Sequence, residues 1–159
     1  MNPTPPVWAR LLSTGFGIGL FPYGPGTLAS LTWTLLYAVS GLAQLPLWGQ
    51  LLGIAGLFGL ALQASQHMQR RYGPDPPRVV VDEWIGQWLA LLPARAEWPF
   101  YALAFGLFRA LDILKPGPIQ SLQRLPGAWG LLLDDVAAGL GAALGVELGA
   151  LIWASATGR

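Results

Sequence analysis

The sequence predicts an all-α fold, an integral membrane helical bundle with four to five short transmembrane or re-entrant helices. Only 11% of the 159 residues are charged and the mean hydropathy is +0.49, whereas soluble domains carry about 25% charged residues. Residues 11–69 contain no Asp, Glu, Lys or Arg, which leaves room for two helical crossings of about 20 residues each. The apolar runs are continuous rather than alternating, which argues against a transmembrane β-barrel.

The first half of the chain divides into a short N-terminal segment, a glycine-rich run and two spans. Residues 1–10 carry one arginine and three prolines without a cleavage-site pattern, so we expect them to be retained. The apolar run 11–21 ends at residues 22–27, where Pro and Gly break a helix and Thr27 is a candidate cap. Residues 28–46 and 47–65 are the first clear spans. The polar, proline-rich stretch 66–78 predicts a loop.

The second half contains three further apolar segments, at residues 79–92, 98–114 and 131–154. A turn at 93–97 separates the first two, residues 115–118 end the second, and a mixed loop follows to residue 130. The first two are shorter than the roughly 20 residues of a full crossing, so they are tilted, partly inserted or one re-entrant pair. Because the sequence shows no repeat, we predict a single membrane-embedded domain over residues 1–159.

The basic residues indicate the orientation, because cytoplasmic loops are enriched in Lys and Arg. With a cytoplasmic N-terminus and five alternating segments, only Arg95 and Arg159 fall on the outer side. The cytoplasmic side then holds the other seven basic residues, which are Arg10, Arg70, Arg71, Arg78, Arg109, Lys115 and Arg124. The same topology places the acidic residues discussed next on the cytoplasmic face.

Five of the eight carboxylates lie within or beside apolar segments, in three islands: Asp82-Glu83, Asp112 and Asp134-Asp135. An ionised carboxylate at the centre of a membrane helix costs roughly 2.5–3.5 kcal/mol. The dipole of a helix N-terminus explains one acid in each pair, but two adjacent acids are harder to explain in this way. A shared divalent cation is the simplest counter-charge, so we interpret these five residues as candidate metal ligands.

Two further features are suited to phosphate. Arg109 and Lys115 place two cations beside Asp112, although Arg109 and Asp112, three residues apart, also fit a simple intrahelical ion pair. Gly26-Thr27 lies at a helix start, where backbone N–H groups can bind an anion. The chain has no cysteine and one histidine, which excludes a thiolate nucleophile and a histidine pair. The net charge of +1 gives no indication of nucleic-acid binding.

Together these motifs resemble the phosphatidylglycerophosphatase A family of bacterial membrane enzymes, in order and with similar spacing over about residues 11–145. The matching pieces are Gly15–Gly19 with Pro22, Pro25–Thr27, Asp75-Pro76, Val79–Glu83 with Gly86, Phe108-Arg109, Asp112, Lys115-Pro116, Pro118-Ile119, Gly127, Gly130, Asp134-Asp135 and Ala138-Gly139. The resemblance implies a magnesium-dependent phosphatase that removes the terminal phosphate of phosphatidylglycerophosphate, giving phosphatidylglycerol, at the cytoplasmic face of the bacterial inner membrane.

On this hypothesis Asp82, Glu83, Asp134 and Asp135 are catalytic, and with Asp112 they hold one or two Mg²⁺, since oxygen-only ligands favour that ion. Gly26, Thr27, Arg109 and Lys115 bind the substrate phosphate, and one carboxylate acts as base. Two other classes remain open: a divalent-cation transporter or channel that uses the acids as an ion site, and an assembly subunit whose acids pair with a partner. The oligomeric state is left open.

Overall fold

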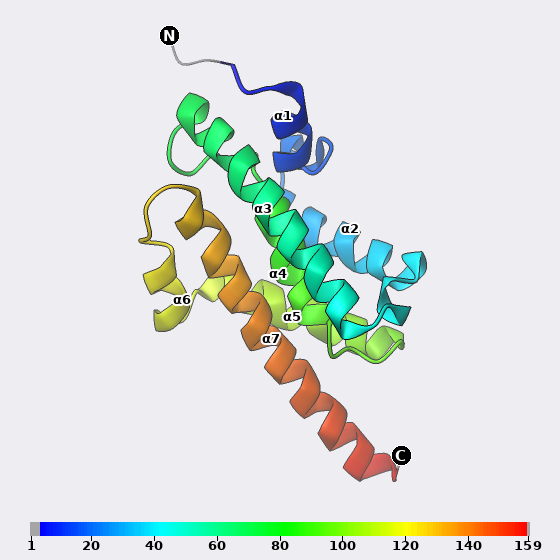
Figure 1. The fold of residues 1–159 in the computed structure, drawn as a ribbon. Helices are drawn as coiled ribbons and strands as arrows, with labels where there is room; N and C mark the ends of the chain where they lie inside the picture. The colour runs from blue at the N-terminus through cyan, green and yellow to red at the C-terminus, as the bar shows by residue number, and fades with distance from the viewer. Residues whose placement is uncertain (1–3, 159) are drawn as a thin grey trace.

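The computed structural model describes residues 4–158, and within them the chain is helical, with no strand. The predicted all-α fold is therefore confirmed. Figure 1 shows the elements, which are α1 (Val7–Ser13), the 3₁₀ turn η1 (Ile18–Leu20), α2 (Pro25–Ser40), the 3₁₀ turn η2 (Leu42–Gln44), α3 (Leu47–Tyr72), α4 (Val81–Leu91), α5 (Trp98–Leu114), α6 (Gly117–Leu122) and α7 (Ala128–Thr157).

Two of these helices, α3 and α7, are long and apolar enough to cross a membrane. The 30 residues of α7 span about 45 Å at 1.5 Å per residue, and its C-terminal part extends beyond the rest of the bundle (Figure 1). The remaining helices of the described chain are shorter than a full crossing. The bundle thus combines two candidate spans with short helices, as the short apolar segments of the sequence predict.

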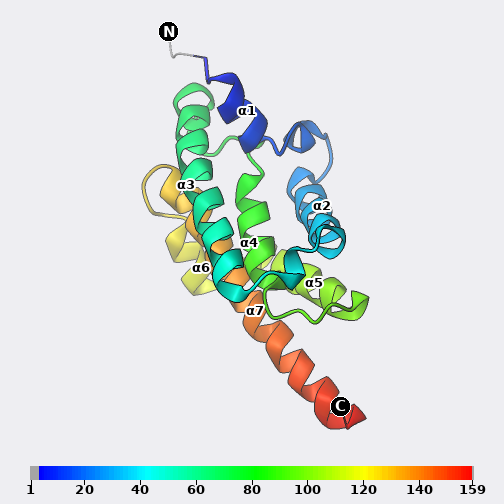
Figure 2. The same ribbon diagram turned by 45° about the vertical axis from the view of Figure 1, so that its right-hand side comes forward.

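The centre of the bundle is the short helix α4. It lies between α2 and α3 (Figure 2) and also contacts α5 and α7. Every residue of α4 is buried except Glu83, which is half-buried. Because neighbouring helices surround α4, its sequence is apolar almost throughout. The charged pair at its start therefore lies in the interior.

Helices α4 and α7 pack closely against each other, and this packing depends on two glycines. A Cβ placed on Gly86 would lie 2.6 Å from the carbonyl oxygen of Asp135, and one placed on Gly139 would overlap the carbonyl oxygen of Gly86. Only residues without side chains allow two helix backbones to come this close. Gly86 follows Asp82 by four residues and Gly139 follows Asp135 by four, so each glycine stands one turn along its helix from an acid.

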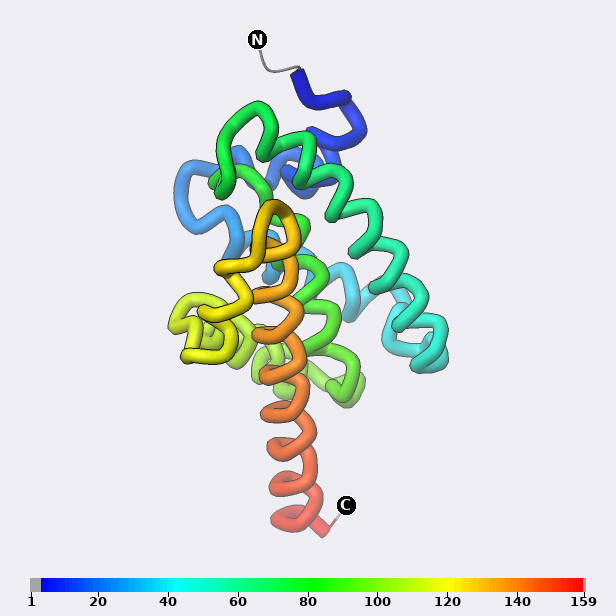
Figure 3. The backbone as a smooth tube through the Cα atoms, turned by 60° about the vertical axis from the view of Figure 1, so that its left-hand side comes forward, coloured from blue at the N-terminus to red at the C-terminus, as the bar shows by residue number. Residues whose placement is uncertain are grey.

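Two connecting segments hold the ends of α4 and α7 in place. The Val80 N–H before α4 donates to the carbonyl of Ser13 at the end of α1 (2.8 Å), and the carbonyl of Arg78 packs against Gly19 so closely that a Cβ there would overlap it. On the other side, residues 115–127 fold back along the N-terminal half of α7 (Figure 3), and α6 contacts that helix.

The structure corrects several boundaries expected from the sequence. The first expected span, residues 28–46, is shorter, because α2 ends at Ser40 before the left-handed Gly41 (φ 79°). Residues 66–72 continue α3 rather than forming a loop, because polar side chains do not end a helix and no Gly or Pro occurs before Gly73. The cap of α2 is Gly24, in the left-handed conformation (φ 57°), with Pro25 in the first helical turn. Thr27 is therefore inside α2. Helix α7 begins at Ala128, three residues earlier than expected.

Candidate functional site

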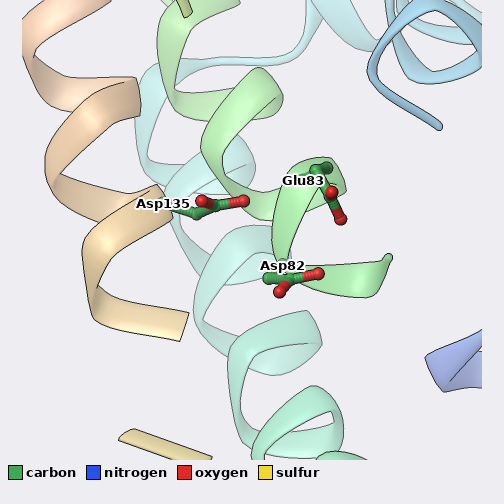
Figure 4. A group of neighbouring side chains, drawn as sticks. All are labelled: Asp82, Glu83 and Asp135. Carbon is green, nitrogen blue, oxygen red and sulfur yellow. The ribbon is translucent and has the colours of Figure 1, made fainter. Parts of the chain in front are cut away.

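Three of the predicted acids converge between α4 and α7. Asp82 and Glu83 occupy the first turn of α4, and Asp135 points toward them from α7 (Figure 4). Each contributes a carboxylate oxygen, and these oxygens lie within 4.8 Å of one another. The Gly86–Gly139 approach creates this meeting, because it brings the preceding turns of the two helices together.

The unpaired oxygens of this group fit a cation. Asp82 Oδ1 and Glu83 Oε2 are buried and have no hydrogen-bond partner within the described residues. A buried charged oxygen without a partner is costly, and like charges this close repel one another. Three carboxylates with two unpaired oxygens are a suitable donor set for a hard metal ion. The cluster can therefore bind a metal ion.

The N-terminus of α2 packs against the Glu83 side chain. A Cβ on Gly26 would overlap Glu83 Oε1, so glycine is required for the carboxylate to lie against the first turn of α2. The positive end of the helix dipole favours negative charge there. Thr27 is exposed. The predicted phosphate-binding turn thus lies next to Glu83, which Gly26 contacts directly.

Asp134 takes a different direction from its neighbour Asp135. Its Oδ2 accepts a short hydrogen bond from Lys115 Nζ (2.5 Å), and its Oδ1 accepts one from the Asp135 N–H (3.0 Å). Burial lowers the pKa of Lys115, but the bond to Asp134 and the nearby charges of Asp135 and Asp112 outweigh it, so the pKa lies above its usual value. Lys115 is therefore protonated at neutral pH.

The backbone of Lys115 is itself unusual, because it adopts a left-handed conformation (φ 42°) at the end of α5. A residue with a Cβ rarely does so, and the strain is commonly found at functional sites. Lys115 Nζ also lies 3.8 Å from Asp112 Oδ1. The turn thus directs the ammonium group between Asp112 on α5 and Asp134 on α7.

Arg109 holds Asp112 in place on the side away from Lys115 by contacts to Asp112 and to α2. Its Nη1 lies 2.7 Å from Asp112 Oδ2 and 3.4 Å from the Ser30 hydroxyl on α2, while the Ser30 hydroxyl donates to the Gly26 carbonyl (2.9 Å). The predicted Arg109–Asp112 ion pair is present. Through it, Arg109 links α5 to the same turn of α2 that contacts Glu83.

Most of the predicted site residues line one polar cavity of about 190 Å³. Its lining contains all five predicted metal ligands and Lys115, but among the described residues it does not include Arg109, Gly26 or Thr27. Two polar lining residues were not predicted as site residues, Gln123 and Asp75, although the resemblance includes Asp75-Pro76. The signal for Asp75 was its place in the loop that leads directly to Asp82; Gln123, in a mixed loop, gave none. Six carboxyl groups and one ammonium group line the cavity, so its formal charge favours a bound cation.

The chain matches the family model described as "Phosphatidylglycerophosphatase A" over residues 11–150. The chain belongs to the phosphatidylglycerophosphatase A family. It is 34% identical to phosphatidylglycerophosphatase A of Escherichia coli over 82% of this chain and 77% of that protein. The Haemophilus influenzae protein of the same name is 37% identical over 82% of each chain.

A Bacteroides thetaiotaomicron protein, provisionally named a phosphatidylinositol-3-phosphatase, is 40% identical over 82% of this chain and 86% of its own length. No solved structure matches the chain significantly. Membership of the phosphatidylglycerophosphatase A family makes this protein a phosphatase, a phosphoric monoester hydrolase. Together with the two apolar helices α3 and α7, it also indicates association with a membrane.

Proposed function

We propose that the protein is a Mg²⁺-dependent lipid phosphatase that hydrolyses the terminal phosphomonoester of phosphatidylglycerophosphate to phosphatidylglycerol and phosphate, in glycerophospholipid biosynthesis. One observation carries the proposal: Asp82, Glu83 and Asp135 converge from two helices in a polar cavity that also holds the Lys115 ammonium. The names of the Escherichia coli and Haemophilus influenzae relatives support the substrate.

The hydrolysis transfers the phosphoryl group from the lipid's ester oxygen to water. When bound, Mg²⁺ supplies Lewis-acid polarisation of the phosphoryl group and lowers the pKa of water. Asp82, Glu83 and Asp135 would hold it, and their unpaired oxygens are the support for that assignment. Among the cavity carboxylates, one accepts the proton of the attacking water, and the leaving ester oxygen takes up a proton as the bond to phosphorus breaks.

The cationic and backbone groups would bind the phosphate. Lys115 lines the cavity and can share its ammonium protons between Asp134 and a phosphate oxygen. Arg109 is tied to Asp112 and Ser30, so its part is to orient Asp112 and to lower the negative charge of the site. The first turn of α2, at Gly26 and Thr27, lies next to Glu83, and the backbone N–H groups of a helix start can bind an anion.

The proposal places the site at the cytoplasmic face of the bacterial inner membrane, within one domain formed by the whole chain. The excess of Lys and Arg on one side of the predicted topology supports this orientation. The acyl chains of the substrate would remain in the bilayer while its phosphorylated head enters the polar cavity. Contact with a phospholipid membrane is then part of substrate binding.

The decisive experiment measures phosphate release by the purified full chain from defined phosphatidylglycerophosphate, with Mg²⁺ and with EDTA. Phosphatidylinositol 3-phosphate is included because of the Bacteroides thetaiotaomicron relative, and glycerol 3-phosphate is the soluble control. We expect Mg²⁺-dependent release from phosphatidylglycerophosphate well above the other two. Faster release from phosphatidylinositol 3-phosphate would contradict the proposed substrate. Undiminished release in EDTA would contradict the proposed dependence on Mg²⁺.

An ion pathway is the competing function, and the distribution of acids argues against it. Acids along a pathway are expected at several depths of a membrane protein. Here all five predicted ligands line one cavity, and Glu147 lines a separate, mainly apolar one. Mg²⁺ flux into liposomes by a chain that releases no phosphate would favour the transporter.

A further inference from the structure

A second cavity lies beside the acidic one and has a different character. Its volume is about 410 Å³, and no residue lines both cavities. The loop before α4 separates them, because Arg78 lines the second cavity and Val79 the acidic one. The second cavity is formed between α1, the turn that follows it, the end of α3 and this loop, and its lining includes Arg10, Leu11, Phe16, Leu20, Met68 and Arg78.

The charged groups of this cavity are all basic. Arg10 and Arg78 line it, and no carboxylate does. Both arginines are exposed, and neither is in an ion pair with a residue in the described part of the chain. Two cations at one cavity, with no carboxylate in its lining, are complementary to an anion such as a phosphodiester.

The rest of the lining is mainly apolar, and one wall is held in a costly conformation. Phe16 has a positive φ of 54°, a region that residues with a Cβ rarely adopt. The residue is 72% exposed, and its ring contacts that of Trp84, with 6.1 Å between the ring centroids. Among residues 4–158 the other non-glycine residue with positive φ is Lys115, at the acidic cavity. Strained residues of this kind concentrate at ligand sites.

We propose that this second cavity binds an anionic phospholipid, with its headgroup phosphate between Arg10 and Arg78 and an acyl chain along Leu11, Phe16 and Leu20. The proposal goes beyond the phosphatase reaction, since none of these residues belongs to the acidic cavity. Charge complementarity selects the headgroup, and the apolar wall selects a ligand with a hydrocarbon chain. A zwitterionic lipid has the same phosphodiester, but its headgroup also carries a positive charge, which cancels the net charge and is repelled by the two arginines. A soluble phosphate ester has the anion but no hydrocarbon chain for the apolar wall.

The location also favours a lipid. In the predicted topology Arg10 and Arg78 both belong to the cytoplasmic side of the membrane, where anionic headgroups attract basic residues. Arg78 is four residues from Asp82, so the loop that would bind the lipid also leads to the acidic cavity. Occupation of the second cavity would fix this loop and the start of α4.

The test counts lipids bound to the purified full chain by native mass spectrometry, with phosphatidylglycerol and with phosphatidylcholine of identical acyl chains. The charge variant is Arg10→Gln with Arg78→Gln. Its control is Arg70→Gln with Arg124→Gln, which removes the same charge from exposed positions that do not line the cavity. Leu20→Trp fills the cavity without changing its charge.

We expect the wild type to retain one phosphatidylglycerol more tightly than phosphatidylcholine. Loss of both cations should weaken the binding of phosphatidylglycerol by about thirtyfold, whereas the control pair should leave it unchanged. Leu20→Trp should also weaken the binding of phosphatidylglycerol, although it changes no charge. Equal retention of both lipids, or an equal loss in the control pair, would overturn the proposal. So would displacement by glycerol 3-phosphate at the concentration at which phosphatidylglycerol displaces, because the apolar wall would then contribute nothing.

Discussion

Gly86 and Gly139 meet at the crossing of α4 and α7, where neither position has room for a Cβ. Because Asp82 and Asp135 stand one turn away on their helices, the separation of the two backbones sets the separation of the carboxylates. The geometry of the site thus depends on two residues without side chains.

Gly139→Ala should therefore reduce activity without removing any functional group. The added methyl group overlaps the Gly86 carbonyl, so the helices must move apart, and a displacement of about 1 Å can cost about a hundredfold in rate. The measurement is phosphate release at saturating Mg²⁺, together with the midpoint of thermal unfolding. Gly59→Ala is the matched control, since no atom lies within 4 Å of its added Cβ. Full activity of Gly139→Ala would show that the helix separation does not govern the site.

Neutralising a carboxylate of the cluster should change stability in opposite directions with and without metal. Without Mg²⁺, Asp82→Asn or Asp135→Asn removes charge repulsion and should raise the unfolding midpoint measured in EDTA. With Mg²⁺ we expect the wild type to gain stability, because an ion that binds the folded state stabilises it, and these variants should lose that gain. Activity should fall by more than about a hundredfold, beyond the effect of losing an outer-shell partner.

The variant Asp134→Asn tests whether Asp134 belongs to the metal-binding group of Asp82, Glu83 and Asp135. Since Asp134 pairs with Lys115 and lies outside the group of three, this variant should keep the Mg²⁺-induced rise of the unfolding midpoint. A loss of that rise equal to the loss in Asp135→Asn would place Asp134 among the metal ligands.

The charge of Lys115 can be tested apart from its strained backbone. Asparagine tolerates a positive φ, so Lys115→Asn keeps the turn but removes the ammonium. We expect kcat/KM to fall by about 10²–10³-fold, as when a charge-stabilising donor is removed. Lys115→Arg retains the cation and should recover part of the loss. If Lys115→Asn and Lys115→Arg were equally impaired, the shape of the side chain rather than its charge would be what matters.

A polar contact away from the site should affect stability alone. The Tyr37 hydroxyl (3.0 Å) and the Trp88 indole N–H (3.4 Å) both donate to Gln50 Oε1, joining α2, α3 and α4 in the apolar interior. Gln50→Met leaves both donors unpaired and should cost about 1–3 kcal/mol. Tyr37→Phe removes one donor and should cost less, about 1 kcal/mol. Unfolding in detergent measures both, and Mg²⁺-dependent phosphate release should stay close to that of the wild type.

The fold was predictable where composition decides it. The scarcity of charge and the length of the apolar runs indicate a helical membrane bundle, and Pro and Gly mark most helix ends. The loop expected at residues 66–72 is wrong, because polar residues are as compatible with an exposed helix as with a loop. Their helix extends α3 to Gly73, and polar residues there are compatible with a helix end that leaves the apolar region.

The candidate site was predictable in its residue types but not in its pairing. An acid in an apolar run is costly, which is why Asp82, Glu83 and Asp135 stand out. That Asp134 faces Lys115 while Asp135 faces α4 could not be foreseen. Adjacent helical residues point about 100° apart, and which of them meets a partner depends on how α7 is rotated against α4. Asp75 and Gln123 come from loops, whose course depends on tertiary contacts.

The burial of α4 on all sides has a consequence for how the protein is made. Its 11 residues extend about 16 Å, roughly half the hydrocarbon thickness of a bilayer, so it cannot insert as an independent span. The two acids in its first turn would also oppose insertion. We therefore expect α4 to take its place only against helices that are already inserted, so that the carboxylates of α4 and α7 come together late in assembly. A nascent chain that has inserted only its long helices would not yet have the group of Asp82, Glu83 and Asp135.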